Sequence, residues 1–109
     1  SLKVLNPLKN QELNIEEIKK GDQAAFNKLY MAFSEKIYNV AIGYTQDTHG
    51  AEEVTQEVFI KIIRNIDKVN QAKNLQHYLY GIVRNTINDY FRKKKREQEE
   101  IKIDSTDEP

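Results

Sequence analysis

Apolar residues recur at steps of three and four positions through most of this 109-residue chain, and little interrupts them. Such steps place side chains on one face of a helix, whereas the period-two alternation of a half-buried strand is absent. The sequence holds four Gly and two Pro, and both prolines, Pro7 and Pro109, lie near its ends. The pattern therefore predicts an all-α fold, a compact bundle of three main helices plus a short N-terminal helix.

Residues that favour helix ends divide this pattern. Asn and Asp are good N-caps because their side chains accept from the free amides of the first turn, and Gly21 is suited to end a helix. Glu17, three residues after Asn14, completes a capping box. The predicted helices, each with its expected N-cap, are residues 15–20 after Asn14, 23–44 after Asp22, 51–66 after Thr48 and 75–97 after Asn74.

Each main helix carries one apolar stripe that is expected to face the core. In the second helix the stripe is Phe26, Leu29, Tyr30, Phe33, Ile37, Val40, Ala41 and Tyr44. In the third it is Ala51, Val54, Val58, Ile62 and Ile66, widened by Phe59 and Ile63. In the fourth it is Leu75, Leu79, Ile82, Val83, Ile87 and Tyr90. Residues 67–73 are expected to form a polar loop, residues 1–13 a flexible arm, and residues 98–109 a mostly disordered acidic tail.

The net charge is zero, but the charges are divided along the chain. Residues 1–60 hold six Lys and nine acidic residues, and residues 97–109 hold one Lys and six acidic residues. Between them, residues 61–96 hold ten Lys or Arg and two Asp. A segment that is this strongly positive can bind a polyanion locally even though the whole chain is neutral.

Nothing in the sequence supports an enzyme. There is no Cys, no glycine-rich phosphate loop, no metal-ligand cluster and no nucleophile beside a base, and His49 and His77 are isolated. We therefore expect no catalytic, cofactor-binding or metal-binding residues. No apolar run has the length of a membrane span and no signal-peptide pattern is present, so we expect a cytoplasmic protein without membrane insertion.

The third helix carries an acidic and polar strip on a face different from its core stripe. Glu53, Gln56, Glu57 and Ile60 lie at i, i+3, i+4 and i+7, which places them together. An exposed Ile among hydrogen-bonding neighbours suits a transient protein interface. The spacing alone leaves two interpretations open: a solvated helix face, or a docking strip for a basic partner.

The fourth helix has a polar face as well. Gly81, Asn85 and Asp89 lie along this face. Arg84, Asn88 and Arg92 are slightly displaced from them around the helix axis. Tyr78 and Tyr80 lie near the start of the helix. Asn can recognise a base edge with a donor and an acceptor, Arg and Lys contact phosphates, and aromatic rings stack on unpaired bases. Basic residues at a helix C-terminus are also favoured by the helix dipole. Composition therefore leaves nucleic-acid binding and an ordinary helix end equally open.

The order of three motifs narrows these alternatives. "GDQAAFNKLYMAFSEKIYNVA", "AEEVTQEVFIKI" and "YLYGIVRNTINDYFRKKKR" follow one another without an obvious gap over about Gly21–Arg96. In this order they resemble region 2 of an extracytoplasmic-function (ECF) sigma factor of bacterial RNA polymerase. The resemblance implies a promoter-recognition domain that binds the clamp helices of the polymerase β′ subunit and the minus-ten element as melted non-template strand.

The resemblance also assigns roles to residues. Glu53, Gln56 and Glu57 match positions that contact the polymerase in the family. Ile60 is added to this set because helical spacing places it on the same face. Residues 67–74 match the loop that holds a flipped base, and Asn85, Asp89 and Arg92 match an Asn-x-x-x-Asp-x-x-Arg motif. The residues expected to contact promoter DNA are Lys68, Asn70, Asn74, Tyr80, Gly81, Arg84, Asn85, Asn88, Asp89, Arg92, Lys93, Lys94, Lys95 and Arg96.

The chain departs from the family in three places. Tyr78 stands where relatives commonly have Trp, Gly81 offers no side chain to a base, and no counterpart of the region 4 helix-turn-helix follows Arg96. We expect residues 14–97 to form the region 2 domain and residues 98–109 to be a linker toward a missing region 4 domain. An alternative interpretation is a helical module that binds a regulator such as an anti-sigma factor, without direct DNA recognition.

Overall fold

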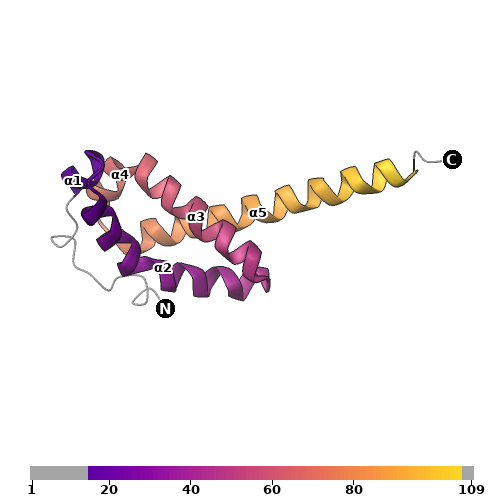
Figure 1. Ribbon diagram of the computed structural model, residues 1–109, viewed down its shortest axis with the longest axis horizontal. Coiled ribbons are helices and arrows are strands. Elements are labelled where there is room, and N and C mark those ends of the chain that lie inside the picture. The colour runs from indigo at the N-terminus through magenta and orange to yellow at the C-terminus, as the bar shows by residue number, and fades with distance from the viewer. Residues whose placement is uncertain (1–14, 107–109) are drawn as a thin grey trace.

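The computed structural model describes residues 15–106, with side chains through Lys102, and this part of the chain is entirely helical apart from short connections (Figure 1). The prediction of an all-α fold is confirmed. Asn14, the expected cap of the first helix, lies outside the described residues. The helices are α1 (Ile15–Lys19), α2 (Gln23–Thr45), α3 (Thr48–Arg64), α4 (Ile66–Gln71) and α5 (Leu75–Thr106).

Two predicted caps are confirmed and one is wrong. Asp22 accepts from the amide of Ala25 at 2.9 Å, and Asn74 accepts from the amide of His77 at 3.1 Å. The cap of α3 is Asp47, not Thr48, because the Asp47 carboxylate accepts from the amide three residues on at 3.0 Å. Thr48 is the first residue of the helix, which therefore begins one turn earlier than predicted.

Three long helices enclose the core. The buried row of α2 runs at steps of four residues and meets the buried faces of α3 and α5. Side chains at the margins of the stripes remain exposed: Tyr30 by 41%, Tyr44 by 59% and Ile63 by 36%. Their assignment to the core was wrong, because the contact between these helices is narrower than the apolar stripe. The largest fully buried side chains are Leu29, Phe33, Ile37, Val54, Val58, Ile62, Leu79 and Val83.

The segment predicted as a polar loop contains a short helix instead. Ile66 and Val69, three residues apart on α4, are both buried and anchor this helix against the bundle. The Lys19 ammonium in α1 meets the Asp67 carboxylate in α4 at 2.9 Å. Only Ala72–Asn74 separate α4 from α5, so the predicted loop is reduced to a short connection.

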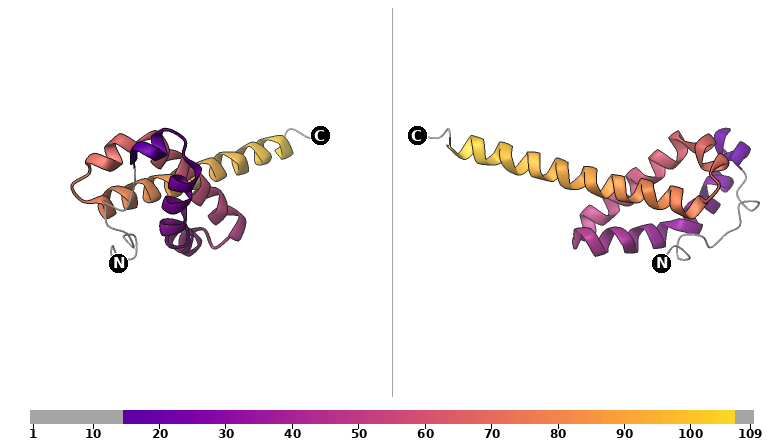
Figure 2. Two further views of the ribbon diagram at one scale, coloured as in Figure 1. Left: turned by 60° about the vertical axis from the view of Figure 1, so that its left-hand side comes forward. Right: turned by 180° about the vertical axis from the view of Figure 1, so that it is seen from behind.

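Helix α5 continues through Thr106, well past the predicted end at Glu97 (Figure 1). The prediction of disorder is therefore wrong for residues 98–106. The stretch from Arg92 to Lys102 consists mainly of Arg, Lys, Gln and Glu, which are strong helix formers, and it contains no Gly or Pro. Figure 2 shows from two further sides that this part of α5 projects clear of the other helices.

Candidate polymerase and nucleic-acid interface

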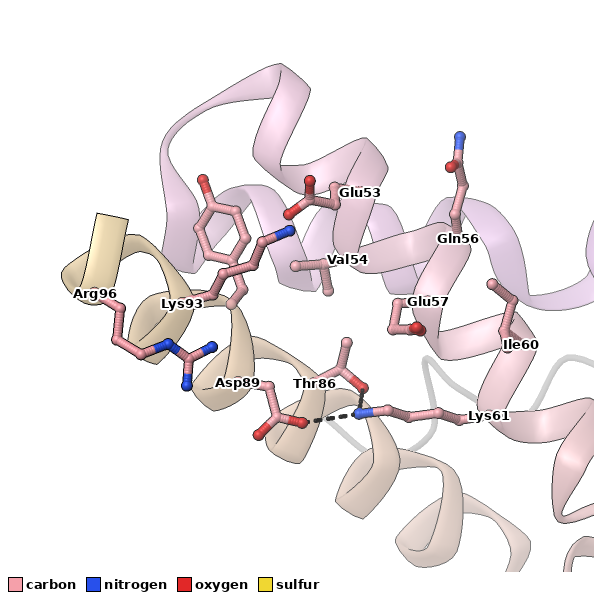
Figure 3. Close-up of a pocket in the computed structure, with 11 residues that line it drawn as sticks. Glu53, Val54, Gln56, Glu57, Ile60, Lys61, Thr86, Asp89, Lys93 and Arg96 are labelled. Carbon is pink, nitrogen blue, oxygen red and sulfur yellow. Dashed lines mark hydrogen bonds and ion pairs between the residues drawn. The ribbon is translucent and has the colours of Figure 1, made fainter. Parts of the chain in front are cut away.

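The strip on α3 borders a groove that it shares with α5. Glu53, Gln56 and Ile60 are exposed and Glu57 is half-buried, and all four line this groove of about 440 Å³. Its opposite wall comes from the basic part of α5, including Lys93 (Figure 3). The structure therefore brings the predicted polymerase-binding residues beside part of the predicted DNA-binding set.

One oxygen in this groove lacks a partner. The Oε2 atom of Glu57 is buried, and no donor among the described residues reaches it. A buried acceptor without a hydrogen bond is unfavourable by about 1–3 kcal/mol. An incoming hydrogen-bond donor, such as a Lys or Arg side chain of a partner, would satisfy this oxygen.

Asp89 is engaged by two cations from different helices. The Lys61 ammonium donates to Asp89 at 3.1 Å and to the Thr86 hydroxyl at 3.0 Å (Figure 3), and Arg92 pairs with the other Asp89 oxygen. Hydrogen bonds from Lys61 and then from Arg92 lower the pKa of the Asp89 carboxyl. Asp89 therefore positions Lys61 and Arg92. Sequence reasoning missed Lys61, although it is the first basic residue of α3 and follows Glu57 by one turn.

Asn85 and Gly81 lie on the face of α5 that is turned away from the core, with Asn85 exposed and Gly81 half-buried. A Cβ atom added at Gly81 would meet nothing within 4 Å, so packing does not require glycine there. At Gly50, by contrast, the added atom would lie 2.8 Å from Cζ of Tyr90, so packing does explain that glycine. The missing side chain at Gly81 leaves the backbone of α5 open to a ligand.

Replacing Gly81 with Ala is expected to stabilise the isolated domain by about 1 kcal/mol, because glycine is unfavourable inside a helix. Thermal unfolding should show a melting temperature about 4–8 °C higher. The same variant should weaken single-stranded DNA binding, because the Cβ occupies the approach to the backbone. Gly43→Ala is the matched control, since Gly43 is also helical and equally open. Equal DNA binding by both variants would contradict the role of Gly81.

The remaining predicted DNA residues do not form one surface. Tyr80, Arg84 and Asn88 turn toward α2 and line a separate pocket of about 310 Å³. Lys68 and Asn70 are exposed on α4, and Asn74 is used as the cap of α5. The structure thus places them on three parts of the domain. Lys93, Lys94, Lys95 and Arg96 are exposed along α5, where the ammonium of Lys94 also lies 5.6 Å from the ring centre of Tyr90.

The described residues hold no group of three His, Cys, Asp or Glu side chains that could bind a metal ion. Within the same part of the chain, no helix is long and apolar enough to cross a bilayer.

The described residues thus form a small all-α bundle that carries an acidic strip on α3 beside an exposed basic run on α5, an arrangement of the class of domains that bind proteins and nucleic acids. The chain belongs to the sigma-70 region 2 family, whose model matches residues 29–97. The resemblance noted from the three motifs is thereby confirmed.

Individual relatives of the chain are named as RNA polymerase sigma factors. The chain is 37% identical over 81 residues to ECF RNA polymerase sigma factor SigW of Bacillus subtilis, covering 74% of this chain and 43% of that protein. It is 33% identical over 76 residues to the ECF RNA polymerase sigma-E factor of Escherichia coli K12, covering 70% and 39%. It is 29% identical over 87 residues to the RNA polymerase sigma-H factor of Pseudomonas aeruginosa, covering 80% and 45%.

The chain therefore spans less than half the length of these curated relatives. No solved structure matched the chain.

Proposed function

We propose that this chain is the promoter-recognition domain of an alternative, ECF-type sigma factor. It binds the clamp helices of the polymerase β′ subunit and the minus-ten element as melted non-template strand, and so directs the polymerase to start transcription in the cytoplasm. The observation that carries the proposal is the open face of α5 at Gly81 and Asn85, which continues directly into the basic run 92–96. The chemistry of initiation belongs to the polymerase.

The two parts of α5 have different tasks in this proposal. Arg84 and the basic run contact phosphates, which adds affinity without sequence information. Asn85 contacts base edges, because its amide offers a donor and an acceptor. Lys68 and Asn70, both exposed on α4, contact a flipped base. Extruding that base costs a few kcal/mol, which such contacts must offset.

Polymerase binding is assigned to the strip on α3. Glu53 and Gln56 are exposed, and Glu57 presents a buried carboxylate oxygen that no donor in the described part of the chain satisfies. A basic segment of the β′ coiled coil supplies the missing donor, and Ile60, which is 46% exposed, gives the contact an apolar centre.

A regulator such as an anti-sigma factor is a second candidate partner, favoured by one further observation. A groove of about 480 Å³ between α2 and α3 is lined mainly by apolar side chains, including Phe26, Tyr30 and Phe59. The rings of Tyr30 and Phe59 are 4.8 Å apart, and Tyr30 remains 41% exposed. An exposed apolar groove of this kind suits a protein partner.

The proposal is tested by retention of DNA on the polymerase. Core polymerase mixed with this domain should hold a labelled single strand carrying a minus-ten-like sequence, whereas core polymerase alone and the domain alone should hold it weakly. Filter retention or fluorescence anisotropy measures the difference. Equal retention with and without the domain would rule the proposal out, and retention of a regulator without any DNA would favour the second candidate.

A further inference from the structure

A pocket on the α2 side of α5 has aromatic walls and an apolar floor. Three aromatic rings line this pocket: Tyr44 from α2, which is 59% exposed, Phe91 from α5, which is 42% exposed, and the half-buried Tyr80. The floor consists of Val40, Val83 and Ile87. Exposed rings around an apolar floor offer a flat ligand a stacking surface.

The polar groups of this pocket suit a ligand that carries a negative charge and a ring with hydrogen-bonding groups along its edge. Among the described residues, Arg84 and Asn88, both exposed, complete the lining of this pocket, and none of its described lining residues is a carboxylate. A tyrosine phenol is protonated at neutral pH, so Tyr44 and Tyr80 add no negative charge. Hydrogen bonding with Tyr44 raises the pKa of the Tyr80 phenol further. The volume of about 310 Å³ lies at the lower end of the range for ligand pockets, which suits a single ring system.

We propose that this pocket binds one unpaired base of single-stranded DNA, stacked among Tyr44, Tyr80 and Phe91, with Arg84 on the adjoining phosphate and Asn88 at the base edge. An apolar peptide would leave Arg84 and Asn88 without function, whereas a nucleotide uses the rings, the cation and the amide together. The proposal goes beyond the assignments made from the family motifs, which include neither Tyr44 nor Phe91.

The pocket also adjoins the open face of α5. Asn88 lies three positions after Asn85 and four positions after Arg84, so it is a neighbour of both on the helix surface and connects the pocket to the open face. A strand that passes the open backbone at Gly81 can therefore contact Asn85 on one side and place a second base in the pocket on the other. This step rests on the proposed binding of a melted strand.

The test measures the affinity of the domain for a short oligothymidylate at low salt. Tyr44→Ala and Phe91→Ala should each weaken binding about fivefold to 100-fold, which is the range for loss of one base–aromatic stack. Both side chains are substantially exposed, so the fold should persist. Met31→Ala is the matched control, because Met31 is an apolar residue of α2 that is 78% exposed and outside every site described above.

A second measurement needs no substitution. Methyl resonances of Val40, Val83 and Ile87 should shift when the oligothymidylate is added to the wild-type domain, because a stacked base lies over them. The methyl groups of Ile63, on the α3 side of the domain, should not.

Two outcomes would overturn the inference. Wild-type binding with both Ala variants within about twofold and unmoved floor methyls would reject the pocket alone and leave the proposed function standing. Absence of oligonucleotide binding by the wild-type domain at low salt, both alone and on the polymerase, would reject the pocket and the proposed function together.

Discussion

The affinity of the domain for single-stranded DNA is expected to fall roughly 10²- to 10³-fold between about 50 and 200 mM salt. Arg84 and the basic run 92–96 are exposed and can contact phosphates of the strand. Each such contact releases counterions from the DNA, so added salt weakens binding. Five or six such contacts predict a log–log slope of about −3.5 to −4.2 for a single strand. Titration of a labelled oligonucleotide at several salt concentrations measures it.

Neutralising pairs of lysines tests whether the DNA is held by the basic run of α5 or by any positive charge on the domain. Lys93→Gln combined with Lys95→Gln should make the slope shallower by about 1.4. Lys20→Gln combined with Lys28→Gln, which removes two exposed charges from the other end of the domain, should leave it unchanged. Binding that does not respond to salt, or the same change in slope for both pairs, would refute the assignment to α5.

Replacing Gln56 and Glu57 with Ala is expected to weaken association with the β′ coiled coil at least tenfold. The double variant removes two neighbouring contacts near the centre of the strip, where truncations have their largest effects. It should not lower stability, because the buried Oε2 of Glu57 has no donor in the described structure and its removal relieves an unsatisfied group. Fluorescence anisotropy with a labelled coiled-coil peptide gives the affinity, and thermal unfolding gives the stability.

Glu52→Ala is the control for loss of negative charge. Glu52 is exposed on the same helix but does not line the groove between α3 and α5. It should change the affinity little. Unchanged binding by the double variant, or equal losses in the double variant and Glu52→Ala, would reject the docking strip.

Local chemistry predicted most of the fold. Asp22 and Asn74 are helix caps in the sequence and in the structure, and Gly21, at φ +84°, ends α1 as expected. Helix α4 could not be predicted, because two apolar residues in six give no recognisable period and its stability comes from burial. The end of α5 was misplaced because the change from basic to acidic residues at Glu97 was taken for a structural boundary. Helix propensity does not depend on that change of sign.

The candidate site was predictable where one helix supplies it. Helical spacing alone placed Glu53, Gln56, Glu57 and Ile60 on one face of α3, and in the structure all four line one groove. Contacts between helices were not predictable, since they depend on how α3 and α5 pack. The Lys61–Asp89 ion pair and the pocket shared by Tyr44 and Phe91 are of this kind. Phe91 did carry a signal, because it is a large apolar residue outside the buried stripe of its helix.

The central claim is that the open face of α5 recognises bases in a melted strand. Selection of single strands from a random library by the complex of core polymerase and this domain tests it most directly. The wild-type domain should enrich one short motif. The Asn85→Ala domain should retain DNA on the polymerase but lose preference within that motif. No enrichment by the wild-type complex, or the same motif with both domains, would contradict the claim.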